Sequence, residues 1–226
     1  MAPHSHGHQQ PATSNQQPAT RMVHGPTNFD KRVRRVAQRP ALDGIRTLMS
    51  PLFPLGLPGG YITMAYAAAY WLRRRGRHGG PAIVTAAWLG WLVHRAVKIG
   101  YRRERPLRPD VPRRTDSFPS GHTTGTTALA STAALVLHRE RLISMPAAVG
   151  IGVGAPAIMG AYRVIADDHW TTDVFGGWML GAAIGLACNA ALGMSSSAAS
   201  NGVRAAESSS RFARRHARRE RFASTT

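Results

Sequence analysis

The stretch Arg163-Val-Ile-Ala-Asp-Asp-His169-Trp-Thr-Thr-Asp173 decides how this chain is interpreted. His169 and Asp173 stand four residues apart, so on a helix they share one face. A carboxylate in that position can accept a hydrogen bond from one imidazole nitrogen and leave the other nitrogen free to attack. Arg163 supplies a planar guanidinium that suits two oxygens of a phosphate. This stretch therefore indicates a site for phosphate chemistry.

A second stretch, Pro119-Ser120-Gly121-His122, comes directly before an apolar run and is predicted to open a helix. The free N–H groups at the start of a helix bind anions. The Ser120 hydroxyl can donate to an oxyanion, and Gly121 lets the backbone approach a ligand closely. His122 would then be placed to give a proton to a leaving oxygen. Taken alone, an ordinary capped helix with a histidine in its first turn would look the same.

A third stretch, Lys98-Ile-Gly-Tyr-Arg-Arg-Glu-Arg105-Pro106, contains one of only two lysines in the chain. Arg105 follows Lys98 by two helical turns and shares its face if the helix continues. A cation at the end of a membrane helix often only extends to the interface, so this stretch means little by itself. The three stretches in this order, each at the same end of an apolar segment, are hard to reach by chance. Together they can hold a phosphate, attack it at phosphorus and protonate the oxygen that leaves.

Apolar segments surround these stretches. Five of them stand out, at approximately 60–72, 81–99, 121–137, 145–165 and 171–193. Each is close to the ~20 residues that span a bilayer as a helix. Many of their residues are Ala, Gly and Thr, which lower the hydropathy but let membrane helices pack closely.

A sixth apolar segment, 42–58, is interrupted by Pro51, Pro54 and Pro58. It could be a kinked crossing or a re-entrant segment, and both alternatives stay open. With this segment counted, the sequence predicts an all-α integral membrane bundle of about six helices, the first of them Pro-broken. The predicted domains are a disordered basic tail over 1–41, a membrane domain over 42–193 and a disordered Arg-rich tail over 194–226.

The formal charge of +18 fits either a nucleic-acid-binding protein or a membrane protein whose basic segments face anionic lipid. Aromatic residues do not interleave with the basic runs, which favours the membrane. The single cysteine, Cys188, excludes an intrachain disulfide and a metal–thiolate site. Asp167 and Asp168 have no further acidic or histidine cluster near them in the sequence, so they make a poor metal site.

Basic clusters at 31–46, 73–77, 139–141 and 204–221 fall on one side if 42–58 crosses the membrane. The positive-inside rule makes that side the cytoplasm. Both termini would then be cytoplasmic, and the three chemical stretches would face the extracytoplasmic side. The cluster Arg102 to Arg114 breaks the rule, and a phosphate-binding role for that loop would explain the exception.

These motifs resemble the type 2 phosphatidic-acid phosphatase superfamily, which also includes class A acid phosphatases and vanadium-dependent haloperoxidases. Its pattern is Lys-x6-Arg-Pro, then Pro-Ser-Gly-His, then Ser-Arg-x5-His-x3-Asp. The chain matches these as Lys98, Arg105 and Pro106, as Pro119 to His122, and as Arg163, His169 and Asp173. It departs from the pattern at Tyr162, where the family usually has serine. That serine is not the nucleophile, so we expect altered packing or phosphate contact rather than lost activity.

The resemblance implies a helical acid phosphatase/haloperoxidase-like core and a phosphohistidine mechanism without cofactor or metal. His169 would attack phosphorus, Asp173 would orient it, and His122 would protonate the leaving oxygen and later activate water. The residues expected to hold the phosphate are Lys98, Arg105, Ser120, Gly121 and Arg163.

The expected activity is hydrolysis of a lipid phosphate at the membrane, with phosphatidic acid, phosphatidylglycerol phosphate and a polyprenyl phosphate or pyrophosphate as the alternatives. Two other functions are weighed against it. A haloperoxidase would bind vanadate in the same place, but this chain is short and rich in membrane segments. A non-catalytic membrane protein could bind phospholipid or nucleic acid through its arginine tails. The complete set of His122, His169 and Asp173 argues against a non-catalytic protein.

Overall fold

The computed structural model describes residues 23–109 and 111–192, and this part of the chain is mostly helical and contains no strand. Its α-helices are α1 (Asn28–Ala37), α2 (Asp43–Met49), α3 (Pro58–Arg74), α4 (Gly80–Gly100), α5 (Gly121–Arg139), α6 (Met145–Val149), α7 (Ala155–Ile165) and a C-terminal helix, Thr171–Leu192. Short 3-10 turns cover Pro40–Leu42, Ser50–Leu52 and Pro54–Gly56. A π-helical segment, Gly150–Gly154, joins α6 and α7 into one continuous helix.

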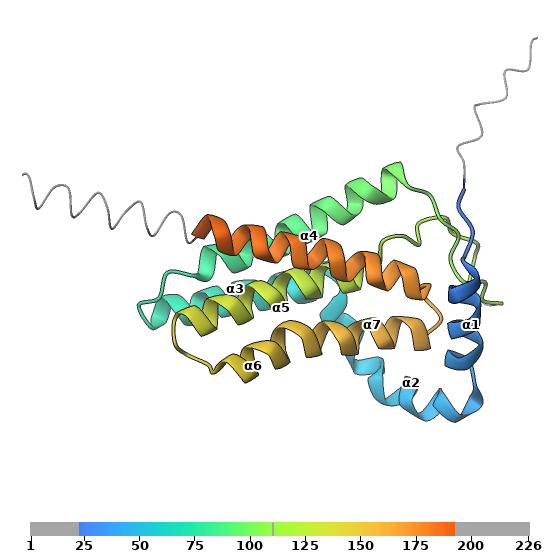
Figure 1. Ribbon diagram of the computed structural model, residues 1–226, viewed down its shortest axis with the longest axis horizontal. Helices are drawn as coiled ribbons and strands as arrows, with labels where there is room; N and C mark the ends of the chain where they lie inside the picture. Colours follow the sequence, from blue (N-terminus) through green and yellow to red (C-terminus); the bar gives the residue numbers. More distant parts are fainter. Residues whose placement is uncertain (1–22, 110, 193–226) are drawn as a thin grey trace, which may run out of the picture.

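The long helices run side by side along the long axis of the molecule (Figure 1). Helix α5 is the central one, since α3, α4, α6 and α7 all contact it. About half of its residues are buried, and most of the buried ones are Thr or Ala. A helix enclosed by protein does not need the apolar surface that lipid demands, which explains its weak hydropathy in the sequence.

Small residues set the distance between α5 and the C-terminal helix. A Cβ built on Gly177 would lie 3.0 Å from the Ser120 carbonyl oxygen, and one on Gly181 would lie 2.6 Å from the Thr124 carbonyl oxygen. Gly185 likewise approaches Ser131 of α5. These glycines stand four residues apart and form one face, which is the arrangement by which membrane helices approach closely. The glycines therefore bring the N-terminal ends of both helices together at the site described below.

Replacement of Gly181 by alanine is expected to destabilise the protein. Its Cβ would overlap backbone of α5 and the Cβ of Thr127 at 2.6 Å, so the two helices must separate. Overpacking of this kind costs about 1–3 kcal/mol, which corresponds to a melting temperature lower by roughly 2–12 °C. Thermal unfolding in detergent measures the change. Gly154→Ala is the matched control, because a Cβ there meets nothing within 4 Å; equal melting temperatures for the two variants would contradict the prediction.

Three helices of the described residues are long and apolar enough to cross a membrane by length and composition: Gly80–Gly100, Met145–Ile165 and Thr171–Leu192. Helix α3 has 17 residues and α5 has 19, so their lengths also approach a bilayer's thickness. These five helices correspond to the five predicted apolar segments. The predicted helical bundle is confirmed, and the predicted count of six crossings is not.

The segment 42–58 forms no helix of spanning length. Helix α2 has seven residues and is followed by two 3-10 turns, one that begins at Ser50 directly before Pro51 and one that begins at Pro54. Proline lacks an N–H group and its ring collides with the preceding turn, so it kinks or interrupts a helix, and here α2 ends at Met49, two residues before Pro51. Segment 42–58 is therefore a short helix followed by 3-10 turns, and the alternative of a Pro-broken crossing is not confirmed.

The N-terminal segment lies at the same end of the bundle as the chemical stretches (Figure 1). Asp30 of α1 contacts Arg103 at 2.6 Å, and Arg34 contacts Asp167 at 2.6 Å. The prediction that basic cluster 31–46 lies at the end of the bundle opposite these stretches is therefore wrong. Residues 28–37 form helix α1, so the predicted disordered tail does not include them. The clusters at 73–77 and 139–141 do share the other end, where Arg77 and Glu140 form an ion pair at 3.3 Å. Residues 1–22 and 193–226 lie outside the described residues.

Candidate active site

Four helix ends meet at one end of the bundle and bring the three predicted stretches together. Lys98 lies in the last turn of α4, and Ser120 caps the start of α5. Arg163 lies in the last turn of α7, and Asp173 lies in the first turn of the C-terminal helix. His169 lies in the loop two residues before that helix begins, so His169 and Asp173 are not on one helix as the sequence suggested. The loop between α4 and α5 adds Arg105, whose Nη1 lies 3.4 Å from His169 Nε2. Residues far apart in the sequence thus share one buried polar site.

His169 is almost fully buried, and its two ring nitrogens face different groups. Nε2 faces Arg105, whereas Nδ1 lies 3.5 Å from Asp173 Oδ2 without hydrogen-bond geometry. Burial lowers the pKa of His169 well below its usual value, and the charges of Arg105 and Arg163 lower it further. The imidazole is therefore neutral at neutral pH and keeps a lone pair for attack.

Asp173 is fully buried and is held by groups other than His169. Its Oδ2 accepts from the Ser117 hydroxyl at 2.5 Å and from the Trp170 N–H at 2.9 Å, and its Oδ1 contacts Arg103 Nη1 at 2.6 Å. The predicted hydrogen bond from His169 to Asp173 is not formed in this structure, although the two side chains are adjacent. The carboxylate is already fixed in place beside the imidazole.

Asp116 lies among the predicted phosphate-binding cations. Its Oδ1 accepts from Arg105 Nε at 2.9 Å, and its backbone oxygen accepts from Lys98 Nζ at 2.5 Å. Arg114 binds the second carboxylate oxygen at 2.7 Å. Burial would raise the pKa of Asp116, but Arg105, Lys98 and Arg114 outweigh burial and hold it at about 2. Asp116 therefore holds these cations close together, with its ionised carboxylate on Arg105 and Arg114 and its backbone oxygen on Lys98.

Arg163 is 4% exposed and its Nε and Nη1 atoms have no hydrogen-bond partner. Its Nη1 lies 3.0 Å from Asp168 Oδ2, but the angle does not suit a hydrogen bond. The guanidinium also lies over the Phe53 ring, 5.3 Å from its centre. A buried guanidinium that keeps unused donors can bind an oxyanion at both of them.

Ser120 and Gly121 open α5 at the centre of the site. The Ser120 oxygen accepts from the Thr123 hydroxyl at 2.9 Å, which leaves the Ser120 hydrogen free to donate elsewhere. A Cβ on Gly121 would lie 2.8 Å from His94 Nε2, so packing against α4 requires glycine here. The predicted reason for Gly121 was close approach to a ligand, and the packing against His94 is an additional one.

His122 lies in the first turn of α5, and its buried Nε2 has no hydrogen-bond partner. The Phe53 ring lies 5.0 Å from the imidazole, centre to centre, and a Cβ on Gly56 would overlap the His122 ring at 2.2 Å. The turns Ser50–Leu52 and Pro54–Gly56 therefore cover His122 from one side. The unpartnered Nε2 is available to a ligand.

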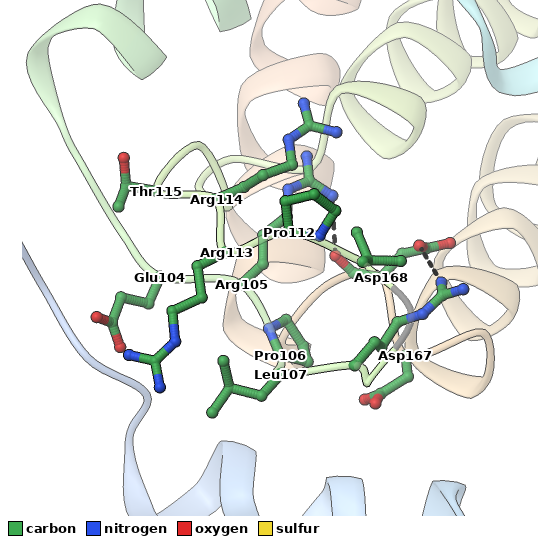
Figure 2. Close-up of a pocket in the computed structure, with 12 residues that line it drawn as sticks. Glu104, Arg105, Pro106, Leu107, Pro112, Arg113, Arg114, Thr115, Asp167 and Asp168 are labelled. Atoms are coloured by element: carbon green, nitrogen blue, oxygen red, sulfur yellow. Dashed lines mark hydrogen bonds and ion pairs between the residues drawn. The ribbon is translucent and has the colours of Figure 1, made fainter.

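A polar pocket borders these residues on the outer side (Figure 2). It is lined by the loop residues Glu104 to Arg108 and Val111 to Thr115, and by Asp167 and Asp168. Arg105 donates from Nη1 to the Asp168 carbonyl oxygen at 3.0 Å within it. The pocket thus shares Arg105 with the site and lies directly beside it.

Comparison with known proteins identifies the family. The model of the PAP2 superfamily matches residues 82–196, which is more than half of the chain. The chain belongs to the PAP2 superfamily. This confirms the resemblance drawn from Lys98 to Asp173.

Individual proteins agree with this assignment. Decaprenylphosphoryl-5-phosphoribose phosphatase of Mycobacterium tuberculosis is 32% identical over 134 residues, which cover 56% of this chain and 68% of that protein. The structure of a transmembrane PAP2-type phosphatidylglycerolphosphate phosphatase from Bacillus subtilis matches with a TM-score of 0.57 and 21% identity, over 71% of this chain and 83% of that one. Aquifex aeolicus LpxE matches with a TM-score of 0.56 and 24% identity, over 74% and 98%. The two structures share the PAP2 fold.

Tyr162, the departure from the PAP2 pattern, is buried beside Arg163. The Arg163 guanidinium carbon lies 5.9 Å from the centre of the tyrosine ring. An aromatic ring therefore lies beside Arg163 where the family pattern has serine. The expectation of altered packing or phosphate contact without lost activity stays a prediction.

Sequence reasoning missed several residues that the structure places at the site: Asp30, Phe53, Arg103 and Ser117. Asp30 and Phe53 precede the part of the chain that the PAP2 model matches. The sequence held one usable signal, since Thr27 and Asp30 have the spacing of a helix capping box. It marks a helix start, but it does not indicate that the helix packs on the site.

Proposed function

We propose that this PAP2 protein is a membrane phosphatase that hydrolyses a lipid phosphate or pyrophosphate through a phosphohistidine intermediate. One observation carries the proposal. Arg163 and His122 keep buried polar atoms without partners, and His169 holds a neutral nitrogen toward Arg105 in the same site. A phosphate is an anion that these groups can bind, attack and protonate together.

In the first step the Nε2 lone pair of His169 forms a bond to phosphorus while the P–O bond to the lipid breaks. That bond's electron pair leaves on the lipid oxygen, which takes a proton from His122. The negative charge of the bound phosphate favours the protonated form of His122 before this transfer. Asp173, beside Nδ1, stabilises the positive charge that develops on the His169 ring.

In the second step a water molecule attacks phosphorus and gives its proton to His122. The P–N bond breaks, its electron pair returns to Nε2, and inorganic phosphate is released. Lys98, Arg105, Arg163, Ser120 and the Gly121 N–H would hold the non-bridging oxygens through both steps. Fixed cations would supply the charge that magnesium supplies in other phosphoryl-transfer sites, so no metal enters the proposal. The described residues contain no group of three His, Cys, Asp or Glu that could hold a metal ion.

An apolar groove next to the site supports a lipid substrate. It has a volume of about 320 Å³ and is lined by Leu52, Leu55, Met64, Ala68, Thr126, Leu129, Ala130, Ala133, Ile151, Ala155, Ile158 and Met159. Thr126 lies one helical turn after His122, and its hydroxyl donates to the His122 carbonyl oxygen at 2.7 Å. The groove thus begins where the leaving oxygen would be, so a hydrocarbon tail could occupy it while the phosphate faces His169.

The substrate alternatives are phosphatidic acid, phosphatidylglycerol phosphate and a polyprenyl phosphate or pyrophosphate. The names of the M. tuberculosis and B. subtilis relatives both describe a phosphatase of a lipid-linked phosphate. Purified protein in detergent should release phosphate from at least one of these lipids in excess EDTA, and the preferred lipid defines the substrate. Release that requires added magnesium would contradict the metal-independent mechanism.

We further propose that the protein spans the cell membrane several times, with the site end facing the extracytoplasmic side. The arginines at 73–77 and 139–141 would face the cytoplasm, as the positive-inside rule expects. The segment from residue 23 to α2 lies at the site end, so basic cluster 31–46 would face the extracytoplasmic side and not the cytoplasm. In a Cys188→Ala background, Arg39→Cys should react with an impermeant maleimide on intact cells, and His78→Cys only after permeabilisation. The opposite pattern would reverse the orientation.

The exposed basic face of α1 is proposed to contact anionic lipid head groups. Lys31, Arg32 and Arg35 line an open hollow with Trp170, at the end of the bundle where the membrane surface would be. Cations near such a surface attract anionic lipids. Changing all three to glutamine should reduce the anionic lipid retained in native mass spectrometry, whereas the same change at Arg73, Arg74 and Arg75 tests for a general charge effect. Equal losses would contradict a role specific to α1.

A further inference from the structure

Helix α1 contributes a buried carboxylate to the site from outside the part of the chain that the PAP2 model matches. Asp30 is 1% exposed, and its Oδ2 lies 2.6 Å from Arg103 Nη2. Arg103 is 4% exposed, and its Nη1 lies 2.6 Å from Asp173 Oδ1. One arginine therefore joins a carboxylate of α1 to the carboxylate that stands beside His169.

Asp30 is fixed by two helix starts at once. Its Oδ2 accepts from the Thr27 N–H at 3.0 Å and from the Thr27 hydroxyl at 2.8 Å, which closes the capping box of α1. Its Oδ1 accepts from the Thr172 N–H at 2.9 Å, in the first turn of the C-terminal helix. Burial would raise the pKa of Asp30, but the hydrogen bonds from Thr172 and Thr27 outweigh burial and lower it. Asp30 is therefore ionised at neutral pH.

Hydrogen bonds of its side chain and its backbone also hold Arg103 in place. Its Nη1 donates to the Thr172 hydroxyl at 2.6 Å, and its backbone N–H donates to the Thr115 carbonyl oxygen at 3.0 Å. Extended backbone pairs it with His24 on one side and Asp116 on the other. The guanidinium is therefore presented to Asp173 in a single orientation.

The charges in this group decide what Asp173 can do for His169. Asp173 paired with Arg103 alone would form a neutral pair, which attracts a positive imidazole only weakly. With Asp30 included, the group of two carboxylates and one guanidinium carries one net negative charge. In a buried environment that charge stabilises the positive charge that forms on His169 during attack.

We infer that Asp30 is a positioning residue of the His169–Asp173 pair and acts through Arg103. It orients the guanidinium that holds Asp173, and it restores the negative charge that Arg103 would otherwise neutralise. The inference rests on the proposed phosphatase function. It adds to that function a residue of α1, an element that the family motifs do not contain.

A purely structural role for Asp30 is the competing explanation, because the carboxylate also fastens α1 to the bundle. Arg34 provides the matched control. Its guanidinium fastens the same helix through Asp167, with contacts of 2.7 and 2.6 Å, and it does not contact Arg103. Arg34→Gln therefore loosens α1 while leaving the group of Asp30, Arg103 and Asp173 intact.

The test compares wild type, Asp30→Asn, Arg34→Gln and His169→Ala in detergent, with kcat, KM, orthovanadate binding and melting temperature as readouts. Asp30→Asn should lower kcat by roughly 10–100-fold and leave KM within about threefold, because one buried charge near the nucleophile is lost. Its affinity for orthovanadate should fall by a similar factor, because vanadate can bond to the nucleophilic nitrogen of His169 and so resembles the phosphate under attack rather than the bound substrate. Arg34→Gln should lower the melting temperature and keep kcat within about threefold.

Two results would overturn the inference. One is equal loss of kcat in Asp30→Asn and Arg34→Gln, and the other is a raised KM with kcat unchanged. If Asp30→Asn does not fold, Thr172→Val serves instead, since it removes the hydroxyl that contacts both Asp30 and Arg103 without changing charge. It should lower kcat by roughly 3–10-fold, and unchanged kcat would count against the inference. Wild-type protein that neither releases phosphate nor binds orthovanadate would instead overturn the proposed function itself.

Discussion

Replacement of His169 by alanine is expected to abolish phosphate release, with a fall in kcat of roughly 10⁴-fold or more. His169 is the residue proposed to form the covalent bond to phosphorus, and Nε2 is the nitrogen that faces Arg105. Alanine has no group that can replace this nucleophile, and the nearest alternative, His122, lies on the proposed leaving-group side. The cations that hold the phosphate would remain, so binding of substrate should be affected much less than turnover.

The measurement is phosphate release from the preferred lipid in excess EDTA, with wild type and variant at equal concentration. His138→Ala is the control, because it removes a histidine at the opposite end of α5. Phosphorus-labelled substrate and an alkaline quench should also trap labelled protein from wild type and none from His169→Ala. Turnover that persists in the variant would sink the phosphohistidine mechanism and leave the PAP2 assignment standing.

Replacement of His122 by glutamine is expected to reduce turnover in a way that depends on the leaving group. For a lipid alkyl phosphate the loss should be roughly 10²–10⁴-fold, since a poor leaving oxygen needs a proton. For an aryl phosphate such as p-nitrophenyl phosphate, the leaving oxygen is stable without a proton and the first step should lose much less. Glutamine keeps a polar side chain of similar reach beneath Phe53, so the packing around Gly56 is retained.

Burst kinetics with p-nitrophenyl phosphate separates the two roles proposed for His122. The variant should show rapid release of one equivalent of p-nitrophenol followed by slow turnover, because water activation in the second step also needs His122. Equal losses for alkyl and aryl phosphates, without a burst, would mean that His122 binds phosphate rather than transferring a proton.

The helical part of the fold was predictable because it depends on local patterns. The apolar segments at 81–99, 121–137, 145–165 and 171–193 each became a helix with nearly the same bounds. Length, apolar content and a low number of charged residues are properties of a contiguous segment, so they can be counted in the sequence. The prolines of segment 42–58 are also visible in the sequence, and they indicated that any helix there would be interrupted.

The topology was not predictable from charge. Clusters 31–46 and 73–77 look alike in the sequence, but they lie at opposite ends of the bundle. Many arginines at the site end are held by acids, as in the pairs Arg34–Asp167 and Arg108–Asp168. The positive-inside rule counts such arginines in the same way as free ones, and the sequence does not reveal which are paired.

By itself, the sequence determined the motif residues and through them the family, because Lys98 with Arg105, Ser120 with His122, and His169 with Asp173 are encoded at short fixed spacings. The tertiary structure alone decided what surrounds them. Asp30 and Asp173 bind Arg103 across 73 and 70 residues of sequence, and no local pattern records such a pairing. These contacts are important because the charges are buried, and a buried charge without a partner costs free energy. The fold alone decides which partner lies within reach.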